Sequence, residues 1–312
     1  MRRLRERRGL CLARGSLLGL LALVLVGLVG CAADERTFSG ERAMAHVETL
    51  VAMGPRHVGS EGNEAAAAYI EKELEEHGWE VELQEFAHRG LPVRNVLGTK
   101  GQGPLVILGT HYDTRPLADR DPQDRSLPVP GANDGGSGTA VLLELARVLD
   151  ERATDQVTIQ LAFFDAEDRA GLGGWNGCVG SYHAAASLTE RPAYVIIVDM
   201  VGDNPQELYY EWSSTLWLQE RIWALAHELG YQHSFVAEHR HNIIDDHTPF
   251  LQQGIPAALI IDFDYIYWHT TLDTPDKLSA ASLERVGRVL ETLLKGEPRV
   301  DSPMWTSGPP LD

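Results

Sequence analysis

Cysteine, basic residues and long apolar runs are all scarce in this sequence. It has 3 cysteines among 312 residues, and its 27 Lys and Arg are outnumbered by 45 Asp and Glu, for a formal net charge of −18. Such an acidic chain argues against nucleic acid or anionic lipid as a partner and favours neutral or cationic substrates. The apolar run from Leu17 to Val29 is shorter than the ~18 residues expected of a transmembrane helix.

The first residues have the pattern of an export signal. An arginine-rich start is followed by the apolar run and then by Leu-Val-Gly-Cys, ending at Cys31. This ending resembles the bacterial lipobox, which implies removal of residues 1–30 and lipidation of Cys31. Ala32 follows in place of the Asp that retains such lipoproteins at the inner membrane. We therefore expect a lipid-anchored protein of the cell envelope, in the outer membrane or facing the periplasm. A plain membrane anchor or an uncleaved signal is the alternative.

The expected mature chain has one free cysteine and one large domain. Cys11 leaves with the signal and Cys31 is acylated, so Cys178 has no partner for a disulfide within the chain. Removal of residues 1–30 takes away six arginines and one glutamate and brings the formal net charge from −18 to −23. We expect a tether over 31–40, a catalytic domain over 41–298 and a C-terminal tail over 299–312.

Helical and strand patterns alternate along the domain. Amphipathic periodicity predicts helices over residues 41–56, 61–79 (stopped at Gly78), 137–151 and 213–230, a short helix after Asp246, and a last helix from Leu278 to Leu293. Apolar runs predict strands over 80–86, 93–98, 104–113, 157–165, 193–202, 207–212 and 255–264. The alternation predicts an α/β fold, a single three-layer domain whose central mixed, mostly parallel sheet is flanked by helices.

Polar residues cluster where the predicted strands end. The strand-end segments lead to His111, to Glu167 with Asp168, to Asp199 and to His269, and Asp134 lies in the glycine-rich segment GANDGGSG that opens a helix. Ligands of such sheets bind beyond the carboxyl ends of the strands. The sequence therefore predicts an active site at this edge.

These residue types fit a metal site. Zinc accepts histidine nitrogen and carboxylate oxygen and keeps a coordination position open in catalytic sites. Asp134, Asp168 and His269 offer three such ligands, and Glu167 is then free beside one of them to move protons. Taken singly, each signal also has a structural interpretation, for example a helix cap in GANDGGSG. Their convergence favours the metal site.

The strand-end segments also resemble a known family. HYDTRPLADRDP, GANDGGSG, FFDAEDRAG, VDMVG, DDHTPF and WHTTLDT are similar to those of the bacterial glutaminyl cyclases of the zinc-exopeptidase clan. The resemblance covers roughly residues 45 to 295. It implies a zinc-exopeptidase-like fold and a glutaminyl-peptide cyclotransferase, which converts the N-terminal glutamine of peptides or proteins to pyroglutamate and releases ammonia.

The resemblance also implies roles at the metal. Asp134, Asp168 and His269 would hold one zinc ion, and Glu167 would shuttle a proton between the α-amine and the departing ammonia. Peptidases of the clan usually carry Glu-Glu where this chain has Glu167-Asp168, whereas the bacterial cyclases have Glu-Asp.

Further roles carried over from the family concern the substrate. Asp199 and Asp245 would form a hydrogen-bonded acidic pair near the reacting amide. Trp268 would line the pocket for the glutamine side chain, with Trp175 and Ile243 as neighbours. As an alternative for Trp268, the aromatic residues around it simply pack a loop.

Two other functions stay open at this stage. A zinc aminopeptidase of the same clan would bind two metals, and the residues for such a site are present: His111, Asp134, Asp168, Asp199 and His269. A catalytically inactive binding lipoprotein would have lost a ligand or the base, and none is lost. The sequence does not indicate the oligomeric state.

Overall fold

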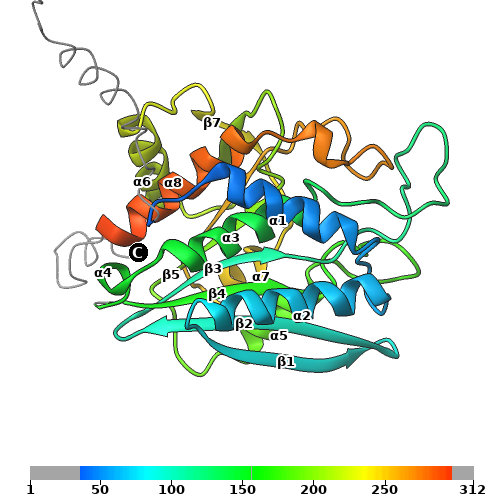
Figure 1. Ribbon diagram of the computed structural model, residues 1–312, viewed down its shortest axis with the longest axis horizontal. Helices are drawn as coiled ribbons and strands as arrows, with labels where there is room; N and C mark the ends of the chain where they lie inside the picture. The colour runs from blue at the N-terminus through cyan, green and yellow to red at the C-terminus, as the bar shows by residue number, and fades with distance from the viewer. Residues whose placement is uncertain (1–35, 156, 297–312) are drawn as a thin grey trace, which may run out of the picture. The chain divides into compact units, whose positions relative to one another are not determined.

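A six-stranded mixed sheet forms the centre of the domain. The computed structural model describes residues 36–155 and 157–296, and its sheet has the strand order β1-β2-β4-β3-β5-β8 (Figure 1). The strands are β1 (Glu80–His88), β2 (Leu91–Gly101), β3 (Leu105–His111), β4 (Thr158–Phe164), β5 (Tyr194–Asp199) and β8 (Ala257–Ile261). The pairs β3-β4, β3-β5 and β5-β8 are parallel, whereas β2 is antiparallel to β1 and β4.

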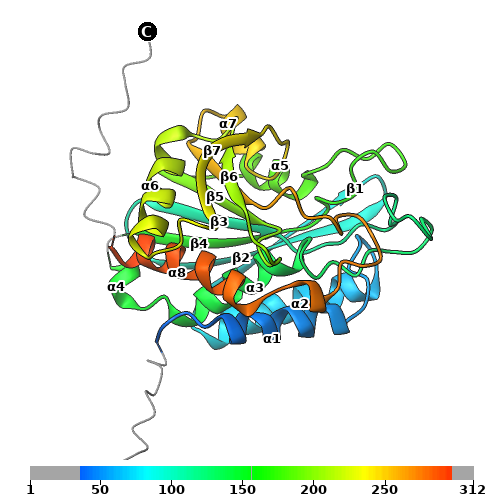
Figure 2. The same cartoon turned by 90° about the horizontal axis from the view of Figure 1, so that it is seen from above.

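Helices cover both faces of this sheet (Figure 2). One layer holds α1 (Gly40–Ala52), α2 (Glu61–Glu76), α3 (Gly136–Val148) and α8 (Ala280–Gly296), and the other holds α5 (Val179–Ala186) and α7 (Thr248–Gln252). The remaining elements are α4 (Glu151–Thr154), α6 (Leu216–Glu228), the 3-10 turn η1 (Pro275–Lys277), and the strands β6 (Leu208–Glu211) and β7 (Phe235–His241), which pair with each other. The predicted three-layer α/β fold is confirmed.

Side chains of the parallel strands alternate between two cores. Val106 and Leu108 of β3 belong to the cluster formed with α1, α3 and α8. Ile107, between them, belongs to the cluster that contains Ala184 of α5 and Phe250 of α7. Every residue of β3 is buried, which explains why the sequence of this strand is apolar throughout rather than alternating.

Local signals fix the ends of the first helices. Ser39 caps α1, and its side-chain oxygen accepts a hydrogen bond from the N–H of Arg42. Ser60 caps α2 in the same way through the N–H of Asn63. Gly78, with φ of 74°, follows α2, so the predicted stop of this helix is confirmed.

The carboxyl ends of the strands bring distant segments to one edge of the sheet. His111 ends β3 and pairs in register with Phe164, the last residue of β4. Asp199 ends β5, the other neighbour of β3. The glycine-rich turn with Asp134 leads directly into α3. The predicted strand ends therefore meet at a common edge.

The strand β7 and the helix α5, besides the short elements α4 and η1, are absent from the sequence-based prediction. The strand β7 is largely exposed, so it lacks the apolar alternation on which strand prediction depends. The helix α5 starts after Cys178, which has left-handed backbone with φ of 58°. A Cβ atom on Gly180 would lie 2.3 Å from the carbonyl oxygen of Asp165. This helix is positioned by close packing of α5 against the residues that follow β4. The sequence-based prediction, which uses helical periodicity, does not detect such packing.

The folded domain begins earlier than the predicted boundary at residue 41. Phe38 is buried against Gly287 of α8, and its N–H donates to Glu291. Part of the predicted tether, 31–40, is thus packed into the domain because Phe38 fills a space that Gly287 leaves. The expected signal over 1–30, the lipidation site Cys31 and the tail over 299–312 lie outside the described residues.

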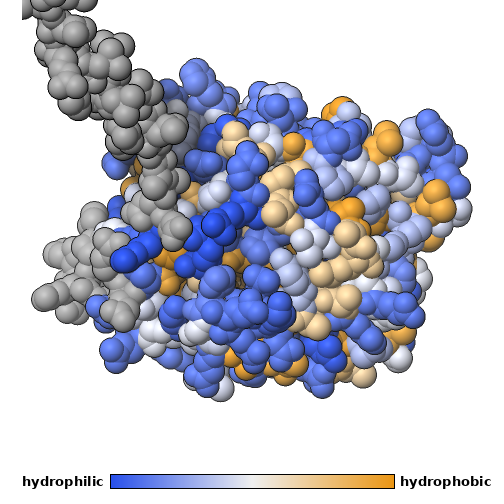
Figure 3. Space-filling view, viewed as in Figure 1, coloured by the Kyte–Doolittle hydropathy of each residue, from blue (hydrophilic) through white to orange (hydrophobic). Residues whose placement is uncertain are grey.

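The face seen in Figure 3 is predominantly hydrophilic, with apolar residues in small groups between the polar ones. This agrees with an excess of acidic residues on the surface of a folded domain. Among the residues that the structure describes, no helix combines the length and the apolar character needed to cross a membrane.

Candidate metal centre and active site

Asp134, Asp168 and His269 converge at the carboxyl edge of the sheet. One potential ligand atom from each lies within 4.8 Å of the other two, and all three side chains are buried. Nε2 of His269 is 3.1 Å from Oδ1 of Asp168 and 3.7 Å from Oδ2 of Asp134. Oδ2 of Asp134 and Oδ2 of Asp168 have no hydrogen-bond partner within the described part of the chain. Buried, unsatisfied carboxylate oxygens beside an imidazole nitrogen fit the ligand set of zinc.

A second candidate ligand group, His111, Asp134 and Asp199, shares Asp134 with the group of Asp134, Asp168 and His269. Nε2 of His111 lies 3.2 Å from Oδ1 of Asp134 and 3.2 Å from Oδ1 of Asp199. These three residues also meet the geometric requirement for holding a metal ion. The structure therefore brings together the five predicted ligands of a two-metal site, with Asp134 placed between the two groups.

Backbone hydrogen bonds position Asp134. The carboxylate of Asp273 accepts the N–H of Asn133 at 2.8 Å and the N–H of Asp134 at 3.1 Å. Gly135 follows in left-handed backbone with φ of 75° and precedes α3, a conformation that glycine adopts at little cost. Asp273 was not predicted to act at the site, although its segment HTTLDT contains the candidate ligand His269.

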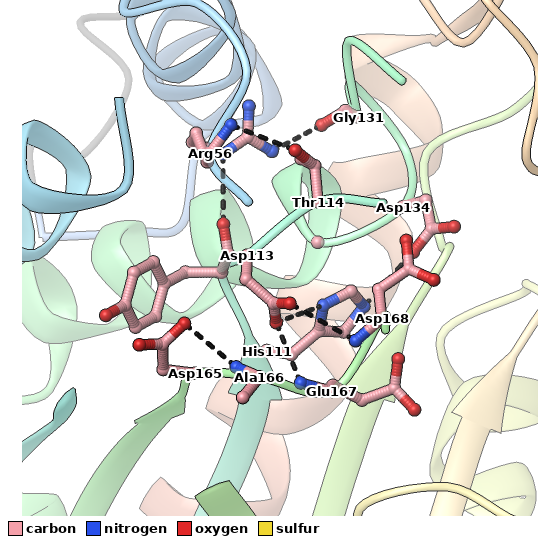
Figure 4. Close-up of polar contacts among 12 residues, drawn as sticks. Arg56, His111, Asp113, Thr114, Gly131, Asp134, Asp165, Ala166, Glu167 and Asp168 are labelled. Carbon is pink, nitrogen blue, oxygen red and sulfur yellow. Dashed lines mark hydrogen bonds and ion pairs between the residues drawn. The ribbon is translucent and has the colours of Figure 1, made fainter. Parts of the chain in front are cut away.

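Asp113 positions the acidic turn after β4. Its two carboxylate oxygens accept the N–H of Glu167 at 3.0 Å and the N–H of Asp168 at 3.2 Å (Figure 4). Its Oδ1 is also 3.4 Å from Nδ1 of His111. Ala166, immediately before this turn, has left-handed backbone with φ of 63°. Asp113 thus links the ends of β3 and β4, a role that the sequence prediction missed.

Asp165, the third acid of the turn, is a structural residue. Its Oδ1 accepts hydrogen bonds from Nδ2 of Asn63 at 2.9 Å and from the N–H of Ala166 at 2.8 Å, and its Oδ2 accepts the N–H of Arg94 at 3.0 Å. Burial, followed by the nearby charge of Asp113, raises the pKa of Asp165 to about 7. Its side chain connects α2, β2 and the acidic turn.

Arg115 is a second residue that the prediction missed. Its Nη1 lies 3.3 Å from Oδ1 of Asp168, and its Nε and Nη2 donate to the two carboxylate oxygens of Asp119 at 2.7 and 2.8 Å. Oδ1 of Asp119 is 3.6 Å from Nδ1 of His269. Through these contacts Arg115 and Asp119 help to orient Asp168 and His269, as residues around metal ligands commonly do.

Burial controls the protonation of the site. It lowers the pKa of His269 to about 4, although Asp134 opposes this, so His269 is neutral and able to bind a metal at neutral pH. Burial, with Asp134 as the next contribution, raises the pKa of Asp168 well above its usual range. Burial lowers the pKa of His111, but the surrounding carboxylates, first of all Asp199, outweigh it and raise the pKa. A bound cation would compensate this concentration of buried carboxylates.

Glu167 precedes Asp168 in the sequence but does not belong to the candidate ligand group of Asp134, Asp168 and His269. Its side chain is not part of either candidate ligand set, and its Oε1 lies 3.4 Å from Sγ of Cys178. Burial raises the pKa of Glu167 well above its usual range, and Asp245 and Asp246 add to the effect, whereas His111 opposes it. A carboxylate with a raised pKa beside a metal site is suited to accept and return a proton.

Asp199 and Asp245 are both buried near the second group. Burial raises the pKa of Asp199 to about 6, and Asp245 contributes to this rise, although His111 opposes it. Among the described residues, Asp199 contacts His111 and makes no direct hydrogen bond to Asp245, whose Oδ1 accepts the N–H of Asp246. The hydrogen bond between the two carboxyl groups stays a prediction.

The three predicted pocket residues lie in two different clusters. Trp268 is half-buried, and its ring centroid is 4.0 Å from that of His269. Trp268 and Ile243 pack against the same apolar cluster. Trp175 is buried in another cluster, where its ring lies 4.7 Å from that of His88. The structure therefore places Trp268 beside the metal group and Trp175 toward β1 and β2.

Comparison with known proteins points to one family. The model of peptidase family M28 matches residues 95–294. The solved glutaminyl cyclase of Tannerella forsythia is 32% identical, with a TM-score of 0.78, over 84% of this chain and 100% of that chain. A solved leucine aminopeptidase precursor of Bacteroides thetaiotaomicron is 28% identical, with a TM-score of 0.79, over 84% of this chain and 98% of that chain.

A curated relative gives the same result. The glutaminyl-peptide cyclotransferase-like protein of Bos taurus is 28% identical over 280 residues, which cover 77% of this chain and 71% of that protein. The family match includes every candidate ligand described above. The chain belongs to peptidase family M28, and glutaminyl cyclases are among its relatives.

Proposed function

We propose that this protein is a zinc-dependent glutaminyl-peptide cyclotransferase that acts on peptides or proteins with an N-terminal glutamine. The observation that carries the proposal is the buried group of Asp134, Asp168 and His269 with Glu167 free beside it. This group occurs in a chain that is 32% identical to a glutaminyl cyclase over the whole of that enzyme.

In the proposed reaction, a zinc ion held by Asp134, Asp168 and His269 would polarise the γ-carbonyl group of the glutamine side chain. The α-amine attacks the γ-carbonyl carbon, and Glu167 accepts a proton from the attacking nitrogen. A new bond forms between this nitrogen and the carbonyl carbon, the bond to the side-chain nitrogen breaks, and Glu167 returns the proton to the departing ammonia. No water molecule is consumed.

Residues around Asp134, Asp168 and His269 would position the substrate. Trp268, half-buried against His269, would form one wall for the glutamine side chain, with Ile243 from the same apolar cluster. Asp199 and Asp245 would interact with the amide nitrogen that leaves. We propose one zinc per chain, held by Asp134, Asp168 and His269, as the likeness to the glutaminyl cyclases implies.

An aminopeptidase is the second candidate function. The group of His111, Asp134 and Asp199 favours it, since this group would hold a second metal ion, and a leucine aminopeptidase precursor is a structural relative. In that case Glu167 would act on a water molecule rather than on the substrate amine.

One experiment separates the two functions. Purified protein is incubated with a peptide that begins with glutamine and, separately, with leucine amide. Release of ammonia from the glutamine peptide, with the number of residues unchanged by mass spectrometry, supports the cyclotransferase. Release of free glutamine or free leucine would instead identify an aminopeptidase.

We also propose that the protein is anchored to the cell envelope by lipid on Cys31. The support is the lipobox-like sequence that ends at this residue, and multiple acyl chains are needed to hold a protein firmly on a membrane. Replacement of Cys31 by Ser is expected to abolish lipid labelling and to release the protein from the membrane fraction, with unchanged specific activity of the folded enzyme. Unlabelled wild-type protein would contradict the anchor.

A further inference from the structure

A cavity of about 770 Å³ lies on the side of Glu167 that faces β1 and α5. Glu167 and Cys178 line it together with a largely apolar set of side chains: Phe86, Trp175, Val179, Tyr182, His183 and Ile244. The volume is within the range of ~300–1,000 Å³ that is typical of small-ligand sites. The cavity therefore opens directly from the residue to which the proposed mechanism assigns proton transfer.

The walls of the cavity are preformed at its inner end. Trp175 is buried and packs edge-on against His88, with the guanidinium of Arg169 on its ring. The rings of Phe86 and His183 stack with their centroids 3.9 Å apart. Contacts of this kind hold aromatic rings in fixed orientations. These side chains provide a rigid apolar surface rather than a space that collapses.

The mouth of the cavity carries exposed apolar side chains. Ile244 is 78% exposed and Tyr182 is 40% exposed. Large apolar residues at the rim of an apolar cavity, on a protein that is otherwise acidic, are typical of a binding site. Among the described residues that line the cavity there is no Lys or Arg, and its cationic candidates are the two histidines His88 and His183.

The covalent structure of the substrate places its second residue near this cavity. If the proposed function holds, the α-amine of the N-terminal glutamine lies at Glu167. The same α-carbon carries the carbonyl group that continues the peptide, and the next α-carbon is 3.8 Å further along the chain. The second residue of the substrate therefore follows directly on the group that contacts Glu167. Its side chain can reach the cavity that Glu167 lines.

We propose that this cavity is the subsite for the second residue of the substrate and that it selects peptides in which an aromatic or large aliphatic residue follows the N-terminal glutamine. The inference rests on the proposed cyclotransferase function. A peptide with glutamate or glycine at the second position gains little from an apolar cavity, since glutamate would lose hydration and glycine has no side chain to bury.

The test compares kcat/KM for ammonia release from four tripeptide amides, Gln-Phe-Ala, Gln-Leu-Ala, Gln-Gly-Ala and Gln-Glu-Ala. The wild-type enzyme is expected to prefer the phenylalanine peptide over the glycine peptide by ~10-fold or more, as apolar pockets discriminate on this scale. Ile244→Ser and Tyr182→Ala are expected to reduce this ratio at least about threefold. Leu216→Ser is the matched control, because Leu216 is an exposed apolar residue at the start of α6, and it is expected to leave the ratio unchanged.

The outcomes separate this inference from the proposed function. Ammonia release from all four peptides at similar kcat/KM, or a preference that Ile244→Ser and Tyr182→Ala leave intact, overturns the subsite while the cyclotransferase stands. Failure to release ammonia from any peptide overturns the cyclotransferase and the subsite with it. Because Ile244 is largely exposed, its replacement tests the cavity without a loss of folding, which a melting curve verifies.

Discussion

Sγ of Cys178 lies 3.4 Å from Oε1 of Glu167, so the thiol of one residue donates a hydrogen bond to the carboxylate of the other. Burial, followed by the negative charge of Glu167, raises the pKa of the Cys178 thiol well above its usual range. The thiol therefore stays protonated at neutral pH and acts as a donor. From this contact we infer that the buried cysteine helps to position Glu167.

Replacement of Cys178 by Ala is expected to lower kcat by about 2- to 10-fold, the effect of losing one modest hydrogen bond, with little change in KM. Cys178→Ser keeps a donor at the same place and is expected to retain most of the activity. Steady-state kinetics with a glutamine peptide, together with melting temperatures, check this. Equal kcat in the Ser and Ala variants would show that the hydrogen bond does not contribute.

Glu167→Gln is expected to lower turnover by ~100-fold or more, because a positioned acid-base residue typically contributes at least that much. Glu167 is outside both candidate ligand sets, so the variant should keep the metal content of the wild type. Parallel kinetics and metal analysis measure the two effects. Near-normal turnover in this variant would remove Glu167 from the mechanism.

The metal prediction concerns stoichiometry. We expect one zinc per chain, complete loss of activity on chelation and recovery when zinc is added back. Asp168→Ala should lose both metal and activity, since it removes one of three ligands. Elemental analysis of the purified protein checks the count. Two tightly bound ions per chain would instead favour the aminopeptidase.

Trp268→Ala is expected to raise KM or lower kcat for glutamine peptides while the melting temperature changes little. The ring is half-buried, and the guanidinium carbon of Arg120 lies 3.9 Å from its centroid. A fully buried tryptophan would cost ~3–5 kcal/mol of stability on truncation. A variant that melts much earlier, yet cyclises at the wild-type rate below that temperature, would assign the ring to packing alone.

A pH-dependent prediction concerns Glu211, which belongs to neither candidate ligand set. Burial raises its pKa, but His247 and the N–H groups of Ser213 and Ile243 outweigh burial and lower the pKa from 4.5 to about 2. A lowered pKa in the folded state stabilises the fold above pH 4.5, and this contribution is lost as the pH falls toward 2. Glu211→Gln should therefore lower the melting temperature at pH 7 more than at pH 3. Equal shifts at both pH values would contradict this.

The sequence predicts that the candidate ligands converge, because their positions follow from strand ends. His111 and Asp199 each end a continuous apolar strand, and parallel neighbours place such ends at one edge whatever the loops do. The segment with Asp134 precedes a helix that packs on the same strands. Apolar strands that end at polar residues, in a mostly parallel sheet, were enough to predict that these residues converge.

The supporting residues could not be predicted in the same way. Asp273 and Asp113 act by accepting backbone N–H groups of the ligand-bearing turns, and Arg115 acts through Asp168 and Asp119. Contacts of this kind depend on the backbone conformation of turns, which residue spacing alone does not specify. Their proximity to predicted ligands in the segments HYDTR and HTTLDT was the available signal.

The buried guanidinium of Arg56 donates to the carbonyl oxygens of Tyr112 at 3.0 Å, Pro130 at 3.1 Å and Gly131 at 2.6 Å, between the turn after β3 and the turn before α3 (Figure 4). The family match begins only at residue 95, so a fragment trimmed to that match would leave these buried carbonyls without their donor. Recombinant fragments for crystallisation or assay need to start ahead of Phe38. Shorter ones are expected to be insoluble or to bind no metal.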